Sequence, residues 1–189
     1  MKILSQTGLI SNFFNSFLIN KISISGPESC GKTSLANWLA REFNVPMVPE
    51  MSREFLESGN LINHKNDILH LAKKQIEAEN KLASSSNGEW LICDTDVLVL
   101  YIWCREKFSP VPAALDALVQ YHRYNFTLLC SPDLPWVHDP WRENPTDRQR
   151  LFVQYKAMLD QWKVPYAVIS GSGIARYHLA KKILSPILK

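Results

Sequence analysis

The stretch Ser25-Gly26-Pro27-Glu28-Ser29-Cys30-Gly31-Lys32-Thr33-Ser34 matches the phosphate-loop pattern G-x-x-x-x-G-K-[ST]. Residues 21–25 before it are predicted to form a strand and residues 33–43 after it an amphipathic helix. In this setting, backbone N–H groups and the positive end of the helix bind phosphate. The stretch therefore predicts binding of a nucleoside triphosphate, without separating ATP from GTP.

Each residue of this phosphate loop (Gly26–Thr33) has an expected task. The glycines let the backbone fold tightly around the anion, Lys32 neutralises charge on the outer phosphates, and the Thr33 hydroxyl is suited to ligate Mg²⁺. We expect nucleotide contacts from Gly26, Pro27, Glu28, Ser29, Cys30, Gly31, Lys32, Thr33 and Ser34.

Composition predicts one globular α/β domain. The chain has 189 residues, of which 46% are hydrophobic and 21% charged. The net charge of +3 is too small to indicate nucleic-acid binding, and no apolar stretch is long enough to span a membrane. The four cysteines show no zinc spacing. No targeting segment is evident, so we expect a cytoplasmic protein.

The order of predicted elements specifies the fold class. Strands over residues 21–25, 45–50, 89–93, 126–130 and 166–170 alternate with helices, which predicts a five-stranded parallel sheet covered by helices on both faces. Such a pattern with a phosphate loop indicates a P-loop NTPase. We expect a kinase domain over residues 21–189 and an N-terminal extension over residues 1–20.

Carboxylates follow the predicted strands, where ligands bind in parallel sheets. Asp94 fits a general base or a magnesium-binding carboxylate, although capping of the next helix is an alternative role. Glu50 fits a substrate contact or an ion pair with Arg53, and Asp133 ends the fourth strand.

Residues 139–150 form a candidate lid segment, because they carry three arginines between prolines and a helix start. Arg142 and its neighbours would stabilise the charge that develops during phosphoryl transfer, and an ordinary solvated loop is the alternative. Trp136 and Trp141 flank Asp139, which suits a flat cationic ring, although core packing would also explain either tryptophan.

Cys30 stands apart from the other cysteines, because it lies at a predicted helix N-terminus that favours a thiolate. One hypothesis is that its oxidation would block nucleotide binding.

Together these motifs resemble the nicotinamide riboside (ribosylnicotinamide) kinase domain of NadR-type proteins, from about Ile22 to the C-terminus. The resemblance rests on the phosphate loop, Val48–Glu57, Asp94-Thr95-Asp96, Pro132–Asp139 with Arg142, and Gly171-Ser172 with Arg176. The most specific of these is the pattern P-D-x-P-W-x-x-D after the fourth strand. Met51-Ser52 departs from the usual aromatic–small pair.

The resemblance implies an adenylate-kinase-like fold, the cofactors ATP and Mg²⁺, and phosphorylation of the 5′-hydroxyl of nicotinamide riboside to nicotinamide mononucleotide in NAD salvage. It places Lys32 and Thr33 at the nucleotide, Asp94 at the metal or as the base, and Arg142 in the lid. It places Trp136 and Asp139 at the riboside and Arg176 near adenine.

Two alternatives stay open from the sequence. A kinase of another nucleoside or of a nucleotide would keep the mechanism, and Arg53 and Arg123 would then supply the charge that binds an existing phosphate. A P-loop regulatory ATPase acting on a protein partner would hydrolyse ATP slowly, without stimulation by any riboside.

Overall fold

The computed structural model describes residues 19–142 and 145–188. The predicted N-terminal extension lies outside this part of the chain, apart from Ile19 and Asn20. Along the chain the elements are β1 (Asn20–Ser25), α2 (Lys32–Phe43), β2 (Met47–Val48), α3 (Met51–Glu57), α4 (Lys65–Ser85), β3 (Trp90–Asp94), α5 (Val97–Phe108), α6 (Ala113–Tyr121), β4 (Phe126–Cys130), α7 (Arg148–Gln161), β5 (Tyr166–Ile169) and α8 (Gly173–Leu184).

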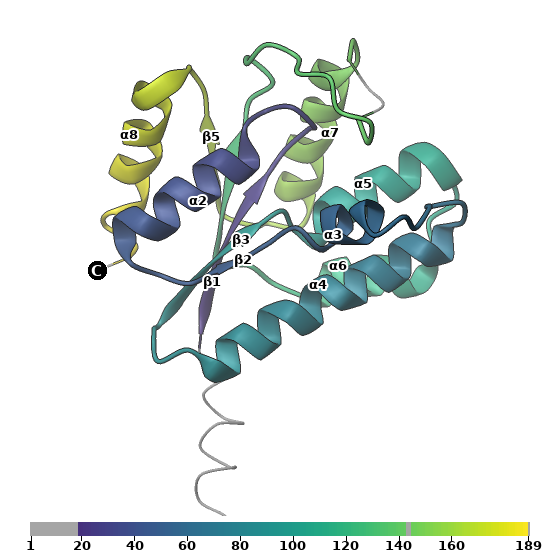
Figure 1. Ribbon diagram of the computed structural model, residues 1–189, viewed down its shortest axis with the longest axis horizontal. Helices are drawn as coiled ribbons and strands as arrows, with labels where there is room; N and C mark the ends of the chain where they lie inside the picture. Colours follow the sequence, from purple (N-terminus) through teal and green to yellow (C-terminus); the bar gives the residue numbers. More distant parts are fainter. Residues whose placement is uncertain (1–18, 143–144, 189) are drawn as a thin grey trace, which may run out of the picture.

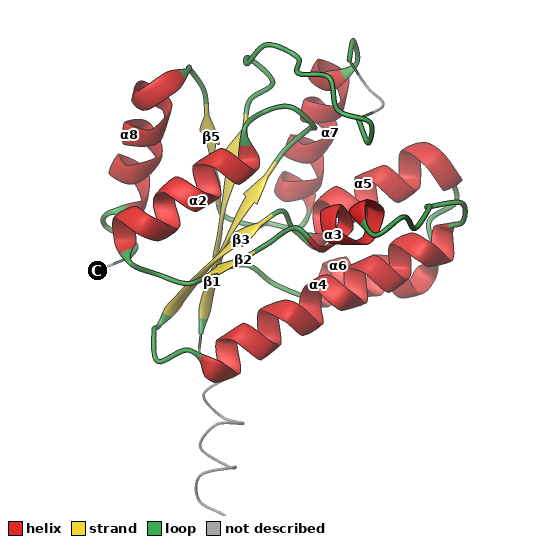
Figure 2. Ribbon diagram, viewed as in Figure 1, coloured by secondary structure: helices red, strands yellow, loops and turns green. Residues whose placement is uncertain are grey.

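The strands form one parallel sheet in the order β2-β3-β1-β4-β5 (Figure 2). In the centre, β1 pairs with β3 through Ile22 opposite Ile92 and with β4 through Ile24 opposite Leu128. These strands are apolar because helices cover both faces of the sheet. The predicted five-stranded parallel sheet is confirmed.

Helices α2 and α8 cover one face of the sheet, while α4, α5 and α7 cover the other (Figure 1). Successive strand residues point to opposite faces. In β1, Ile22 and Ile24 pack into the core beneath α2 and α8. The intervening Ser23 is also buried, and its hydroxyl pairs with that of Thr127 on β4 at 2.7 Å.

The carboxyl ends of the strands bring three segments together at one end of the sheet (Figure 1). These are the phosphate loop after β1, the N-terminus of α3 after β2, and the β4–α7 loop, described over residues 131–142 and 145–147. Within the described residues, no helix is long and apolar enough to cross a bilayer.

The phosphate loop passes so close to β4 that its first residue must be glycine. Gly26 has φ of 130°, and a Cβ added there would lie 2.7 Å from the carbonyl oxygen of Cys130. That distance is shorter than real Cβ contacts allow, and the φ is one that other residues rarely adopt. The first glycine of the motif therefore keeps the loop against β4.

Candidate active site

The phosphate loop ends in an open helix N-terminus. Gly31, the N-cap of α2, has φ of 77°, and among the described residues no side chain caps the helix. The first turn carries no acidic residue. Its free N–H groups and the helix dipole therefore remain available to an anion.

Lys32 folds back over the loop, where its Nζ donates to the carbonyl oxygens of Gly26 at 3.0 Å and Pro27 at 2.9 Å. Burial alone would lower the pKa of Lys32, but the negative groups around it, among them Glu50 and Asp94, raise the pKa overall. The ammonium group therefore stays charged where the outer phosphates of a nucleotide would bind.

Asp94 lies at the end of β3, with 2% of its surface exposed. Burial raises the pKa of Asp94 to about 6, although a hydrogen bond from the Thr33 hydroxyl and the charge of Lys32 act in the opposite direction. Capping of the next helix falls to Asp96, which accepts from the backbone N–H of Val99 at 3.0 Å. Asp94 therefore does not cap the next helix, which was the alternative role considered from the sequence.

Asp94 and Thr33 fit a magnesium site. Oδ1 of Asp94 is buried and has no hydrogen-bond partner within the described part of the chain, so it is an oxygen ready to take a cation. Over the same residues, no cluster of three or more His, Cys, Asp or Glu side chains could hold a metal alone. Mg²⁺ at phosphate sites needs only one or two protein ligands besides the phosphates.

The backbone directly after Asp94 is strained. Thr95 has φ of 77°, which is unusual for a β-branched residue, and its N–H donates to the Ile24 carbonyl at 3.2 Å. Such strain concentrates at functional sites, where the surrounding fold maintains it. It is a feature that the sequence alone did not reveal.

A pocket of about 230 Å³ opens beside the phosphate loop. One wall comes from α3 and its N-cap, and the opposite wall comes from α5, α7 and the β4–α7 loop. The apolar lining residues are Leu56, Val99, Ile102, Trp103, Trp141, Leu151 and Tyr155. The polar lining residues outside the phosphate loop are Ser34, Glu50, Ser52, Arg53, Glu106 and Arg142.

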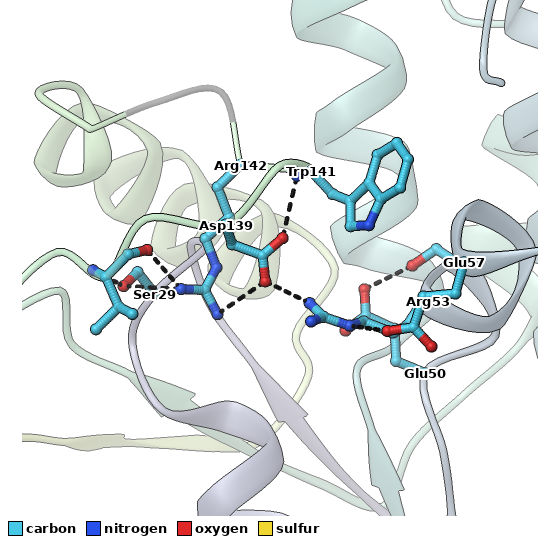
Figure 3. A network of polar contacts seen from close by, with 9 residues as sticks. Ser29, Glu50, Arg53, Glu57, Asp139, Trp141 and Arg142 are labelled. Atoms are coloured by element: carbon cyan, nitrogen blue, oxygen red, sulfur yellow. Dashed lines mark hydrogen bonds and ion pairs between the residues drawn. The ribbon is translucent and has the colours of Figure 1, made fainter. Parts of the chain in front are cut away.

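Asp139 joins the two sides of this pocket (Figure 3). Its carboxylate accepts from Arg53 Nη1 at 2.8 Å and from the Trp141 N–H at 3.0 Å, and Arg142 Nη2 lies 3.8 Å away. Burial alone would raise the pKa of Asp139, but the Trp141 N–H and the two guanidinium groups hold it below its ordinary value. Arg53 is further held by Glu57, which accepts from Nε at 2.9 Å.

Two arginines connect the β4–α7 loop and α7 to the phosphate loop. Arg142 Nη1 donates to the Val137 carbonyl at 2.7 Å and to Ser29 Oγ at 3.4 Å (Figure 3). Arg148 Nη1 donates to the Ser29 carbonyl at 3.1 Å, and its guanidinium lies 5.6 Å from the centre of the Trp136 ring. Arginines of the predicted lid segment therefore contact the nucleotide-binding loop.

Arg176 stabilises the phosphate loop through hydrogen bonds to its backbone and to neighbouring loops. This buried side chain donates to the carbonyl oxygens of Cys30 at 2.9 Å, Gly171 at 2.8 Å and Ser131 at 3.2 Å. It also pairs with Asp133 at 2.8 Å, so this strand-end carboxylate is bound to a neighbouring side chain.

Cys30 is buried beneath the loop, where its thiol donates to the Pro27 carbonyl at 2.7 Å. Burial alone would raise the pKa of Cys30, but a hydrogen bond with Cys130 and the charges of Lys32, Arg176 and Arg148 lower it to about 7. The two thiols therefore lie side by side between the phosphate loop and β4.

The structure brings together most of the residues singled out from the sequence. Residues 27–34, Glu50, Arg53 and Arg142 line the pocket, and Asp94 lies beside Thr33. Trp136 stacks against Arg148, Asp139 bonds to Arg53, and Arg176 is enclosed, so none of the three lines the pocket as described.

Sequence reasoning missed the wall formed by α5 and α7. Val99, Ile102, Trp103 and Glu106 recur at helical spacing on α5, directly after the strand end at Asp94. That spacing, with a glutamate on an otherwise apolar and aromatic face, was the available signal.

Curated proteins are similar to this chain in sequence. The trifunctional NAD biosynthesis/regulator protein NadR of Escherichia coli K12 is 24% identical over 156 residues, covering 79% of this chain and 38% of that protein. The chain therefore spans well under half the length of this curated relative.

Solved structures show the same fold. NadR in complex with NR superposes with a TM-score of 0.77 at 19% identity, covering 93% of this chain and 52% of that one. NadR in complex with NAD and AMP-PNP gives 0.73 at 20% identity, covering 93% and 51%. Deoxyadenosine kinase from M. mycoides gives 0.57 at 11% identity, covering 88% and 99%.

The resemblance to NadR-type proteins that the motifs indicated is thus confirmed. A family profile described as an AAA domain matches residues 21–176, from the first strand to Arg176 in the last helix. Because this match spans well over half of the chain, the protein belongs to that AAA domain family.

Proposed function

We propose that the chain is a kinase that transfers the γ-phosphoryl group of ATP to the 5′-hydroxyl of nicotinamide riboside and forms nicotinamide mononucleotide. The observation that carries the proposal is the pocket shared by the phosphate loop and α3, α5 and α7. An acceptor in this pocket would lie against the end of a nucleotide bound in the loop.

In the proposed reaction, Lys32 and the N–H groups of α2 bind the transferring phosphate, and Thr33 would hold Mg²⁺. Asp94 fits two roles, metal ligand and base, and we assign it the role of base. The metal, when bound, supplies positive charge that neutralises the phosphate oxygens. Asp94 accepts the proton of the 5′-hydroxyl as its oxygen forms a bond to phosphorus and ADP leaves. The raised pKa of Asp94, about 6, suits a base that works near neutral pH.

Glu50 is the alternative base, because it lines the pocket, whereas Asp94 lies beside Thr33 and is not among the lining residues. Its carboxylate already accepts from the Ser52 hydroxyl at 2.5 Å, whereas one oxygen of Asp94 has no described partner. A free carboxylate oxygen favours Asp94 for the proton, and we assign Glu50 to the acceptor's sugar.

The lining suits a cationic aromatic ring. Trp103 and Trp141 line the pocket together with Glu50 and Glu106. Tryptophan faces attract a cation by about 2 kcal/mol in desolvated sites. The Glu50 carboxylate adds negative charge to the lining, whereas Glu106 is paired with Arg150. The pyridinium ring of nicotinamide riboside is flat and positively charged, so its chemistry matches this lining.

The arrangement of Arg53 favours a nucleoside over a nucleotide acceptor. Two nitrogens of its guanidinium are engaged by carboxylates, Nε by Glu57 and Nη1 by Asp139. Arg142 is likewise occupied by the Val137 carbonyl and Ser29. A phosphate on the acceptor would have to compete with these partners for the two guanidinium groups and approach the lining carboxylate of Glu50.

The test is ADP release from ATP and Mg²⁺ in the presence of nicotinamide riboside, its uncharged dihydro form, and a panel of common nucleosides and nucleoside monophosphates. We expect strong stimulation by the riboside, weak stimulation by the dihydro form, and nicotinamide mononucleotide as product. Stimulation by another nucleoside would replace the acceptor. Slow hydrolysis unaffected by any acceptor would contradict the kinase proposal.

A matched pair of tryptophan variants tests the pocket. We expect Trp103→Leu to raise the KM for the riboside about tenfold, the loss that one cation–π contact implies. Trp38→Leu changes a tryptophan that stacks on Tyr177 between α2 and α8, outside the pocket lining, and should leave this KM unchanged.

A further inference from the structure

Two polar side chains of α4, Gln75 and Glu79, are enclosed in the protein interior, with exposed fractions of 1% and 0%. Neither lines the pocket as described. Gln75 nevertheless reaches the acceptor side of the site, because its Oε1 accepts from the backbone N–H of Met51 at 3.1 Å. Met51 is the first residue of α3, the helix that presents Ser52, Arg53 and Leu56 to the pocket.

The hydrogen bond from the Met51 N–H to Gln75 gives α3 the N-terminal cap that it otherwise lacks. The first N–H groups of a helix have no partner within the helix and are normally satisfied by a capping side chain. Among the described residues, no side chain caps α3 in the usual way, and the carboxylate of its N-cap Glu50 accepts from Ser52 Oγ instead. Gln75 therefore caps α3 from a neighbouring helix and leaves Glu50 turned toward the pocket.

Glu79 determines which end of the Gln75 amide faces α3. An ionised carboxylate only accepts hydrogen bonds, so the amide NH₂ must point toward it and the amide oxygen must point away. Gln75 Nε2 lies 3.5 Å from Glu79 Oε1, and the amide oxygen accordingly faces the Met51 N–H.

Glu79 is fixed in turn by donors from separate elements. Lys21 Nζ at the start of the sheet lies at 3.1 Å, His122 Nε2 at the end of α6 at 2.6 Å, and the Tyr124 hydroxyl at 2.8 Å. The carboxylate therefore holds a constant position relative to β1, and through Gln75 it transmits that position to the start of α3.

We propose that Gln75 is a positioning residue for acceptor binding, which fixes the N-terminus of α3 so that Glu50, Ser52 and Arg53 meet the acceptor, with Glu79 orienting its amide. This rests on the proposed function only in taking the α3 pocket as the acceptor site. Neither Gln75 nor Glu79 touches the acceptor itself.

The experiment is the substitution Gln75→Met, which keeps the length of the side chain and removes its hydrogen bonds. We expect the KM for the riboside to rise about tenfold, the loss typical of a buried hydrogen bond, while the KM for ATP changes less than about twofold. Amide hydrogen exchange at Met51, followed by NMR in the full chain, should become faster.

Asn80→Ala is the matched control. Asn80 belongs to the same cluster, because its Oδ1 accepts from Lys21 at 3.3 Å, but no described contact joins it to α3. Because Asn80 is exposed, this variant should lower thermal stability less than Gln75→Met does, and riboside KM and Met51 exchange should stay at wild-type values. A second variant, Glu79→Gln, lets the Gln75 amide turn over and should speed Met51 exchange in the same direction.

Wild-type riboside KM and Met51 exchange in folded Gln75→Met would overturn the proposal. Equal rises in the KM for ATP and in the KM for the riboside of Gln75→Met would also overturn it, because a general loss of stability would explain them. If the wild-type protein phosphorylates no acceptor, the proposed function fails, and Met51 exchange alone still decides whether Gln75 fixes α3.

Discussion

The nucleotide side and the acceptor side of the site are stabilised by different kinds of interaction. On the nucleotide side, the Lys32 ammonium and the Arg176 guanidinium donate mainly to backbone carbonyls of the loops around them. On the acceptor side, pairs of charged side chains join α3 to the β4–α7 loop and α5 to α7, as in Arg53 with Asp139 and Arg150 with Glu106. The first arrangement fixes a loop, and the second connects separate elements.

This difference has a consequence for how each half responds to change. Backbone carbonyls do not titrate and cannot be altered by substitution, so the nucleotide side depends on its two cations. The acceptor-side pairs are partly exposed, with Arg53 at 46%, so each pair contributes modestly and is screened by water.

The largest effect is expected from Lys32→Ala. Removing a preorganised charge at the transferring phosphate should lower turnover by about a thousandfold. Steady-state ADP release measures this. Lys156→Ala is the control, because Lys156 is an exposed lysine of α7, and it should behave as wild type. Equal activity of the two variants would remove Lys32 from the chemistry.

Arg176→Met should have the next largest effect and act on stability. It leaves the carbonyl oxygens of Cys30, Gly171 and Ser131 without this donor and removes the partner of Asp133, which should cost about 3 kcal/mol of unfolding free energy. Urea unfolding measures the loss.

The control for Arg176 lies in the same helix. Lys181→Met removes an exposed pair with Glu42 and should cost less than about 1 kcal/mol. If Arg176→Met were no more destabilising than Lys181→Met, the two halves of the site would not differ as described.

Asp139→Asn should produce a smaller and more selective effect. Asparagine keeps an acceptor for the Trp141 N–H but removes the charge that holds Arg53, so we expect the riboside KM to rise about fivefold and the ATP KM to stay constant. The freed guanidinium should also improve use of a nucleoside monophosphate.

Glu57→Gln is the control for Asp139→Asn, because Glu57 pairs with Arg53 within α3 and does not reach the β4–α7 loop. A fivefold rise in riboside KM in both variants would mean that any ion pair of Arg53 supports acceptor binding. The connection between α3 and the β4–α7 loop would then have no special role.

Lowering the pH should destabilise the acceptor side before the nucleotide side, and this is the smallest of the expected effects. The pKa of Asp139 is below its ordinary value. The pKa of Glu79 is lowered as well: burial would raise it, but His122, the charge of Lys21 and the hydrogen bond from Tyr124 outweigh burial. A carboxylate with a depressed folded-state pKa stabilises the fold above its unfolded pKa, and this stability is lost as pH falls through the folded value.

Hydrogen exchange between pH 6 and pH 3, over roughly the range in which carboxylates titrate, measures this. We expect α3 and residues 137–142 to lose protection before the phosphate loop does, after correction for the intrinsic exchange rate. Simultaneous loss in both regions would show that the charged pairs do not stabilise the acceptor side locally.

The nucleotide side was predictable from the sequence because its information is local. Residues 26–33 contain the glycines, the lysine and the hydroxyl in one motif, and the flanking periodicity predicted the strand and the helix that hold it. The order of strands and helices likewise predicted the parallel sheet, which is confirmed.

The acceptor side was less predictable because its contacts join residues far apart in the chain. The pairing of Arg53 with Asp139 spans 86 positions, and no local pattern marks either residue as the other's partner. Trp103 and Glu106 belong to a helix whose inward face also fills the core, so periodicity alone does not separate pocket from packing. The roles assigned to the site residues stay predictions, including those of Asp139, Trp136 and Arg176, which do not line the pocket as described.

The hydrogen bond from Arg176 to the phosphate loop also matters for the design of shortened or fused versions of the protein. The Cys30 carbonyl in the phosphate loop and the guanidinium that supports it are 146 positions apart, at opposite ends of the described chain. A truncation that removes α8 would leave the whole motif intact in sequence and still take away one of its supports. The smallest nucleotide-binding unit of this fold therefore extends from β1 through α8.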